Sequence, residues 1–292
     1  MNSKQSERYN GQASRSGSPL PRDDNFSRAL PAAAAFDWLK AGWADFRQQP
    51  GPSLAYGILA FVLSIVLIGG LFALDLDYIL FPAIAGFMVV GPFLAIGLYE
   101  KSRLIQEGRP VSLREMILVR GQSMGQLLFS GVLLCLLMLL WMRAAVIIYA
   151  LFFGLQPFPG LDDVTGMLFT TPTGLWLLLV GSLVGGLFAA FAFAISVFAI
   201  PMLLNEKSDA LTAMGTSMAF VWNNLPVMLT WGVIVVVLFG LSTITGFLGL
   251  VVAFPVLGHA TWHAYLAVRQ PERYMRTTSS GQPEEGYNGA VS

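Results

Sequence analysis

The chain has little charge, almost no histidine and a single cysteine. Asp, Glu, Lys and Arg make up 12% of its 292 residues, whereas soluble domains usually carry about 25%. The net charge is zero, so the composition gives no reason to expect a nucleic-acid partner. The lone Cys135 excludes a disulfide within the chain and any cysteine-based zinc or iron–sulfur site.

The sequence also lacks the motifs of common catalytic sites. It has no nucleotide-binding loop, no zinc-protease motif and no serine-hydrolase elbow. We therefore do not expect an enzyme. Residues 1–30 contain no apolar core of a secretory signal peptide. We interpret residues 1–30 and 270–292 as disordered cytoplasmic tails that flank a membrane domain at residues 31–269.

Long apolar stretches are what the sequence does contain. No residue from Ala210 to Val268 is charged, and one bilayer crossing needs about 20 mostly apolar residues. The pattern predicts an all-α, polytopic transmembrane helix bundle. We expect six spans, with a seventh if Ala144–Gly154 forms its own segment. The six are Gly51–Leu74, Tyr78–Tyr99, Met124–Gly154, Gly174–Leu204, Pro226–Leu241 and Gly249–Val268.

The distribution of Lys and Arg predicts the orientation, because basic residues collect on the cytoplasmic side. With both termini in the cytoplasm, every basic residue except Arg143 lies on the inner side. Four acids then lie on the outer side, and these are Asp75, Asp77, Asp162 and Asp163. The lipid bilayer is the expected partner, with other membrane subunits as a further candidate.

Three similar segments precede the first, third and fifth spans, namely Gln48–Gly57, Gln122–Gly131 and Asn223–Gly232. An amphipathic helix is predicted ahead of each. The first covers Ala33–Gln48, the second begins at the Ser112 capping box, and the third begins near Ser208. Their large apolar residues would face lipid or the bundle. The pattern predicts cytoplasmic interfacial helices and a threefold parallel repeat of helix, span, turn and span.

The first of these helices has two predicted faces. Phe36, Leu39, Trp43 and Phe46 lie near one face, and charged residues including Asp45 lie mostly elsewhere. The third helix carries its large apolar side chains at Leu211, Met214, Met218 and Trp222.

Two histidines are the principal candidates for chemistry. His259 and His263 are four residues apart on the sixth span and share one helical face. They could ligate one metal ion, but two imidazoles are only half of a tetrahedral zinc site. The favoured interpretation is neutral imidazoles that hydrogen-bond across helices. Glu100 is their expected charged neighbour, with Asn205 and Glu206 as others.

Arg143 is the other exceptional residue. At about 1.5 Å per residue it lies about 30 Å from the start of the third span, at the outer interface. We expect its side chain to snorkel and to pair with an outer carboxylate. The alternative is an anion contact that faces an outer cavity.

The fourth span carries small residues at every fourth position, which are Ser182, Gly186, Ala190 and Ala194. Small residues at this spacing let helix backbones approach closely. We interpret them as a helix-packing stripe rather than a binding site.

Four segments together resemble a bacterial integral-membrane family known as domain of unknown function 2189: Trp38–Arg47, Gly91–Arg103, Leu140–Arg143 and Gly258–Tyr265. The resemblance covers about residues 31–270. It implies a multi-pass protein of the bacterial inner membrane without an established activity. Some relatives carry the label cytochrome c oxidase subunit I. This chain does not support that label, because a haem–copper centre needs histidines on several spans.

Three functions stay open. The first is a non-catalytic scaffold, assembly factor or accessory subunit, with no cofactor. The second is a carrier or channel for a small solute, with a polar path around His259, His263, Glu100 and Arg143. The third is a haem- or metal-binding accessory protein of a respiratory complex, in which His259 and His263 are ligands and another chain supplies the rest.

Overall fold

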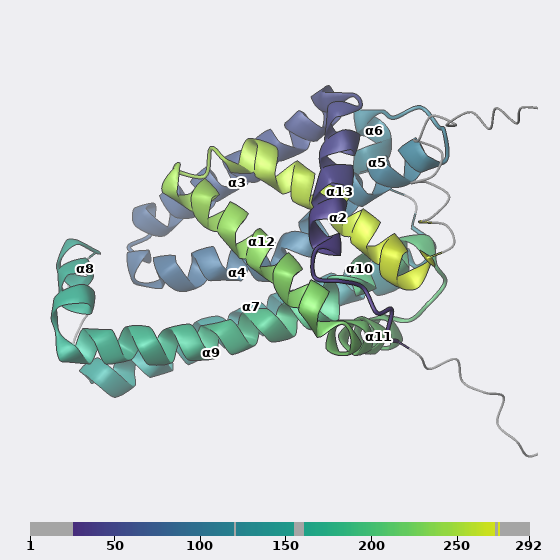
Figure 1. Ribbon diagram of the computed structural model, residues 1–292. Helices are drawn as coiled ribbons and strands as arrows, with labels where there is room; N and C mark the ends of the chain where they lie inside the picture. Colours follow the sequence, from purple (N-terminus) through teal and green to yellow (C-terminus); the bar gives the residue numbers. More distant parts are fainter. Residues whose placement is uncertain (1–25, 120, 155–160, 272–273, 275–292) are drawn as a thin grey trace, which may run out of the picture.

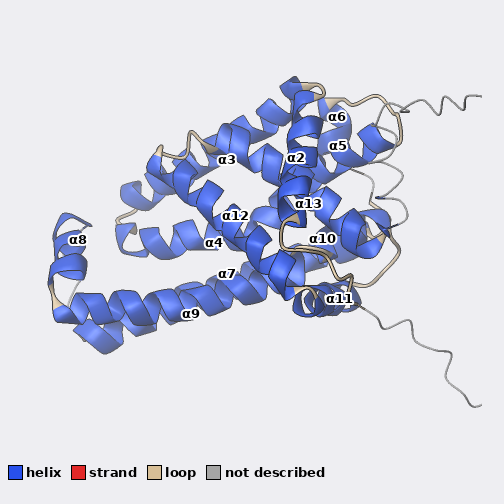
Figure 2. Cartoon of the chain, in the orientation of Figure 1, coloured by secondary structure: helices blue, strands red, loops and turns tan. Residues whose placement is uncertain are grey.

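The structure is a computed structural model that describes residues 26–119, 121–154, 161–271 and 274. Regular secondary structure in these residues is entirely helical (Figures 1 and 2). Six helical segments among them are long and apolar enough to cross a membrane. They are α3 (Pro50–Ala73), α4 and α5 (Leu80–Leu94 and Ile96–Gln106), α7 (Met124–Phe153), α9 and α10 (Pro172–Ser196 and Ala199–Asn205), α12 (Leu225–Ile244) and α13 (Leu250–Arg269).

These segments confirm the prediction of six spans. The helix α7 runs without a break to Phe153, so Ala144–Gly154 continues the third span instead of forming a seventh. The first two spans are joined by a short turn with Asp75 in the left-handed region, followed by the 3-10 helix η1 (Asp77–Ile79).

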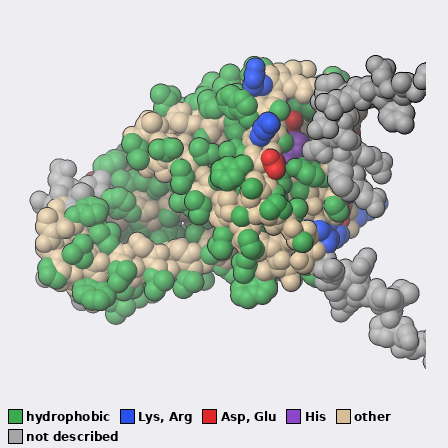
Figure 3. All heavy atoms as spheres, in the orientation of Figure 1, with side chains coloured by type: hydrophobic (Ala, Val, Ile, Leu, Met, Phe, Trp, Pro, Cys, Tyr) green, Lys and Arg blue, Asp and Glu red, His purple; other side chains and the backbone are tan. Residues whose placement is uncertain are grey.

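The two ends of the bundle differ in chemistry. One end holds α8 (Leu161–Thr170) and η1, and we call it the distal end (Figure 1). The other holds α5, α6 (Leu113–Ile117) and α11 (Ala210–Asn223), and we call it the polar end. Figure 3 shows apolar side chains over most of the visible face, with charged side chains gathered toward the polar end.

Two shorter helices agree with the predicted interfacial helices in extent. They are α2 (Ala34–Arg47) and α11, and α2 runs steeply across the direction of α7 and α9 in Figure 1. At the second predicted position the Ser112 capping box is formed, but α6 has only 5 residues against 14 in the other two helices. The threefold repeat is therefore not shown.

The large apolar side chains of α2 and α11 lie on both sides of these helices. Phe36 and Trp43 of α2 and Trp222 of α11 are exposed, whereas Trp38 of α2 and Phe220 of α11 are buried. Gly42 and Asp45 of α2 are buried as well, because α2 packs on α13, the span with the lowest hydropathy.

The fourth span is divided at the polar end by a side chain from α11. Ser217 Oγ donates to the carbonyl of Ala194 at 2.7 Å and accepts from the N–H of Phe198 at 3.1 Å. A hydroxyl that enters the ladder of backbone hydrogen bonds breaks a helix in this way. The same contact holds α11 against the end of α9.

The core lies around the polar-end half of α13. Every residue from Gly258 to Val268 is buried. Glycines allow three helices to approach α13 closely. A Cβ at Gly42 of α2 would overlap Ala260, and one at Gly57 of α3 would overlap the carbonyl of Val251. On α13 itself, a Cβ at Gly258 would overlap Leu98 of α5. The helix that carries both histidines is thus enclosed by α2, α3 and α5.

The segment before α2 is also attached to the polar end. Asn224 donates to the carbonyl of Phe26 at 2.8 Å and accepts from the N–H of Arg28 at 2.8 Å. Arg28 Nε donates to the carbonyl of Val268 at 2.7 Å. Residues 26–30, the end of the predicted N-terminal tail, are therefore docked on the bundle. Residues 1–25 and 275–292 of the two predicted tails lie outside the described part of the chain.

Candidate functional site

His259 lies in the interior of the bundle with no exposed surface. Its Nε2 is 2.9 Å from Ser53 Oγ on α3, and its Nδ1 is 2.9 Å from Ser102 Oγ and 3.1 Å from the carbonyl of Leu98 on α5. Both ring nitrogens are therefore bound to protein groups. One imidazole joins three helices.

The partners determine which nitrogen carries the proton. The carbonyl of Leu98 can only accept, so Nδ1 carries the hydrogen that it receives. Ser53 accepts a hydrogen bond from Lys101, which leaves its own hydroxyl hydrogen for Nε2. This assignment satisfies every group with a neutral His259, and it rests on the hydrogen-bond pattern rather than on observed hydrogens.

Lys101 is linked to this histidine through Ser53. It is fully buried, and its ammonium donates to Ser53 Oγ at 2.7 Å and to the carbonyl of Gln49 at 2.8 Å. Gln49 sits at the left-handed corner between α2 and α3, with φ of 60°. A buried ammonium is costly unless an opposite charge compensates it. Asp45 is the opposite charge that acts on Lys101.

Asp45 also binds the second histidine. Its Oδ2 is 2.9 Å from Nε2 of His263, and both side chains are about nine-tenths buried. An ionised carboxylate only accepts hydrogen bonds, so Nε2 of His263 is the donor. Asp45 therefore links α2 to α13, and its charge also acts on Lys101 through space. We call two neighbouring hydrogen-bonded groups the polar cluster. One is Asp45 with His263, and the other is Ser53 with Lys101, Ser102 and His259.

A second polar group lies next along α13. Tyr265 donates to Glu206 at 2.7 Å, and Arg269 binds the same carboxylate through Nη2 at 3.0 Å and Nε at 3.2 Å. Burial raises the pKa of Glu206, but the hydrogen bonds from Arg269 and Tyr265 outweigh burial and bring this pKa below its ordinary value. Asn205 donates to the hydroxyl of Tyr265 at 3.1 Å. Asn205 and Glu206 thus contact α13, but not its histidines.

The middle of the chain matches a known protein family. Residues 80–205 match the family of predicted integral membrane proteins DUF2189. No match was found among curated proteins or among solved structures. The chain is accordingly an integral multi-pass membrane protein.

The match to DUF2189 is shorter than the resemblance over residues 31–270. It runs from the start of α4 to the end of α10. Lys101 and Ser102 lie within it, whereas Asp45, Ser53 and both histidines lie outside. The Gly258–Tyr265 segment therefore has no support from the family match.

Glu100 does not contact either histidine. It is buried and binds Arg103 one turn later at 2.7 Å, and its Oε2 has no hydrogen-bond partner among the described residues. The carboxylate beside the histidines is Asp45 instead. Sequence reasoning missed Asp45, Ser53, Lys101 and Ser102. The only sequence signal for these four residues was their position near the ends of the apolar segments. Many other polar residues share that position.

Arg143 lies on the surface of α7 toward the distal end and is exposed. It makes no ion pair with Asp75 or with any other described side chain. The side chains of Asp77, Asp162 and Asp163 are outside the described part, so pairing with these acids stays a prediction.

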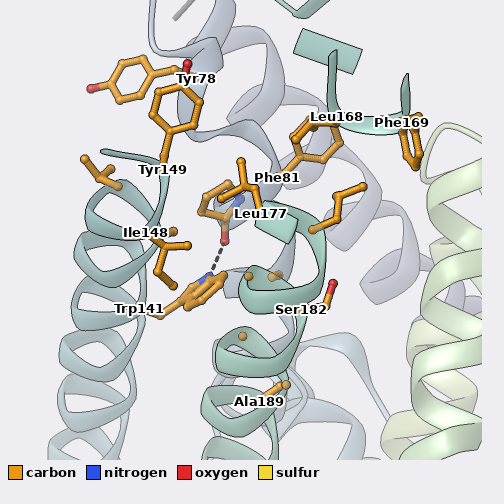
Figure 4. A pocket seen from close by; sticks show the side chains of 18 residues that line it. Tyr78, Phe81, Trp141, Ile148, Tyr149, Leu168, Phe169, Leu177, Ser182 and Ala189 are labelled. Carbon is orange, nitrogen blue, oxygen red and sulfur yellow. Dashed lines mark hydrogen bonds between the residues drawn. The ribbon is translucent and has the colours of Figure 1, made fainter. Parts of the chain in front are cut away.

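The predicted packing stripe of α9 faces different surroundings along its length. Ala194 accepts the hydrogen bond from Ser217 of α11. Ser182 and Gly186 instead line a cleft between α4, α7 and α9 (Figure 4). A Cβ at Gly186 would meet nothing within 4 Å. Close helix contact occurs at neighbouring Gly185, which packs on the ring of Trp141.

Proposed function

We propose that this DUF2189 protein is a non-catalytic membrane protein, a scaffold, assembly factor or accessory subunit, and that its polar cluster holds the polar end of the bundle together. The observation that carries the proposal is that both ring nitrogens of His259 bind protein groups. The charge of Asp45 acts on the buried ammonium of Lys101 through space. Polar groups that are satisfied by one another stabilise a specific packing.

The residues do not fit a haem or metal ion at the two histidines. Nε2 of His259 is bound to Ser53, and Nε2 of His263 is bound to Asp45. No group of three or more His, Cys, Asp or Glu side chains that could hold a metal ion occurs among the described residues. A structural or catalytic zinc site uses at least three protein ligands. Another chain would have to supply the remainder.

An optical spectrum and a metal analysis of the purified protein test this proposal. We expect neither a Soret band nor a stoichiometric metal ion, because both ring nitrogens of His259 and Nε2 of His263 are hydrogen-bonded within the fold. His263→Gln is the comparison, since this side chain lies at the edge of the cluster. One haem or metal ion per chain that is lost in His263→Gln would overturn the proposal.

The carrier or channel stays the alternative. It needs a polar path through His259, His263, Glu100 and Arg143. Arg143 is exposed on α7 toward the distal end, whereas the other three lie buried toward the polar end. No hydrogen bond or ion pair links these two groups in the described part of the chain. This separation favours the structural role.

We further propose that the polar end faces the cytoplasm of a bacterial inner membrane, with both termini inside. The support is that Lys101, Arg103, Lys207 and Arg269 gather at that end, as the positive-inside rule requires. Asp75 lies in the turn at the opposite end.

Cysteine labelling tests the orientation. In a Cys135→Ser background, we expect a membrane-impermeant maleimide to label Asp75→Cys in intact cells. Lys207→Cys is the matched control on the other side, and it should react only after the cells are made permeable. Both original side chains are exposed, so each cysteine should be accessible. The reverse pattern would contradict the proposed orientation.

A further inference from the structure

A large apolar cleft lies between α4, α7, α8 and α9 toward the distal end. Its volume is about 760 Å³, within the range of roughly 300–1,000 Å³ for small-molecule sites. Aromatic rings from four elements line it, including Tyr78 of η1, Phe81 of α4, Tyr149 of α7 and Phe169 of α8 (Figure 4). None of its lining residues is charged.

The ring of Trp141 joins the helices on one side of the cleft. On α9, glycines leave the cleft open because they have no side chains. Trp141 donates through Nε1 to the carbonyl of Pro82 at 3.1 Å, which joins α7 to α4 (Figure 4). The same ring packs on Gly185 of α9. Beside this contact, a Cβ at Gly181 or at Gly186 would meet nothing within 4 Å. The glycines therefore hollow the face of α9 where a larger residue would fill the space.

The cleft continues the surface that lipid covers. Three of its walls, α4, α7 and α9, are membrane spans. Val146 lines the cleft and is exposed, and Leu183 and Leu187 beside it on α9 are exposed as well. Hydrocarbon is the solvent at this depth, since the backbone and side chains of a span face acyl chains. A chain that enters here passes directly from the bilayer.

The rim indicates the position of the headgroup. Figure 4 places Tyr78 and Tyr149 at one end of the cleft and Ala189 at the other. Tyrosines with an apolar ring and a polar tip are typical of the headgroup level. Neither Asp75 nor Arg143 lines the cleft. The described lining therefore carries no charge that selects one kind of headgroup.

We propose that this cleft binds an acyl chain of a membrane phospholipid, with the headgroup at the Tyr78 and Tyr149 end. The site is distinct from the polar cluster and goes beyond the proposed structural role. It gives the span α9 a ligand-binding face in addition to its packing face.

Native mass spectrometry of the full chain in detergent tests the proposal, with phosphatidylethanolamine or phosphatidylglycerol of identical chains added. We expect one phospholipid of either kind to stay bound at collision energies that remove other lipids. Gly186→Phe fills the cleft and should lower retention about tenfold, the effect of leaving roughly two methylene groups outside. Gly240→Phe on α12 is the matched control, because a Cβ there also meets nothing within 4 Å.

Equal retention by Gly186→Phe and the wild type would overturn the proposed site, as would a wild-type protein that holds neither lipid. Ser182→Leu, on the same face one turn earlier, provides a second cleft-filling variant if Gly186→Phe does not fold. It should lower retention in the same direction.

Discussion

Replacement of Asp45 by Asn is expected to destabilise the protein by about 3 kcal/mol. Removing one partner of a buried charge pair costs roughly 3–5 kcal/mol, and Asp45 is placed at the lower end because it acts on Lys101 through space. The variant leaves the ammonium of Lys101 uncompensated in the interior and weakens the bond to His263. Thermal or denaturant unfolding of the purified protein in detergent measures the loss.

Two further variants separate this explanation from a general effect of changing α2. Asp37→Asn lies on the exposed side of the same helix, and we expect little change. The double variant Asp45→Asn with Lys101→Met removes both charges. It should be more stable than Asp45→Asn alone, because no uncompensated charge is left. If Asp45→Asn unfolds at the same temperature as Asp37→Asn, the polar cluster does not contribute as we describe.

Replacement of Gly57 by Ala should have an effect of similar size for a steric reason. The added methyl group would overlap the backbone carbonyl of Val251, and backbone atoms cannot rotate away. The helices α3 and α13 must then move apart, which also draws Ser53, one turn earlier on the same face, from His259. Overpacking typically costs about 1–3 kcal/mol, and we expect the upper end of that range in the same unfolding measurement.

Gly70→Ala is the control within the same helix. A Cβ there meets nothing within 4 Å, and Ala is favoured over Gly in a helix by about 1 kcal/mol. This variant should be as stable as the wild type or slightly more stable. A loss of stability in Gly70→Ala comparable with that in Gly57→Ala would show that the close approach of α3 and α13 is not the cause.

The span pattern could be read from composition because each span buries its own backbone hydrogen bonds and needs only length and apolar character. The start of α6 at Ser112 and the start of α11 at Asp209 were equally local, since a capping side chain binds the backbone three residues ahead. These features involve neighbouring residues only. They required no knowledge of how the helices pack.

The partners of the histidines could not be read in this way. Adjacent residues on a helix point about 100° apart, so Glu100, Lys101 and Ser102 face three directions. The sequence favoured Glu100 by charge, whereas the rotation of α5 turns Lys101 and Ser102 toward the interior. Asp45 and His263 are 218 positions apart. Only the packing of α2 on α13 brings them together.

The residues of α9 illustrate the same division. A small residue every fourth position is a local pattern, and it established that one face of the fourth span is free of bulky side chains. Whether such a face packs on a helix or opens to lipid depends on its neighbour. Ala194 meets α11, whereas Gly186 borders a cleft. Apolar length and capping are properties of one segment, and so the sequence contains them; a cluster or a cleft is a property of several helices, and its position follows from their rotation and spacing.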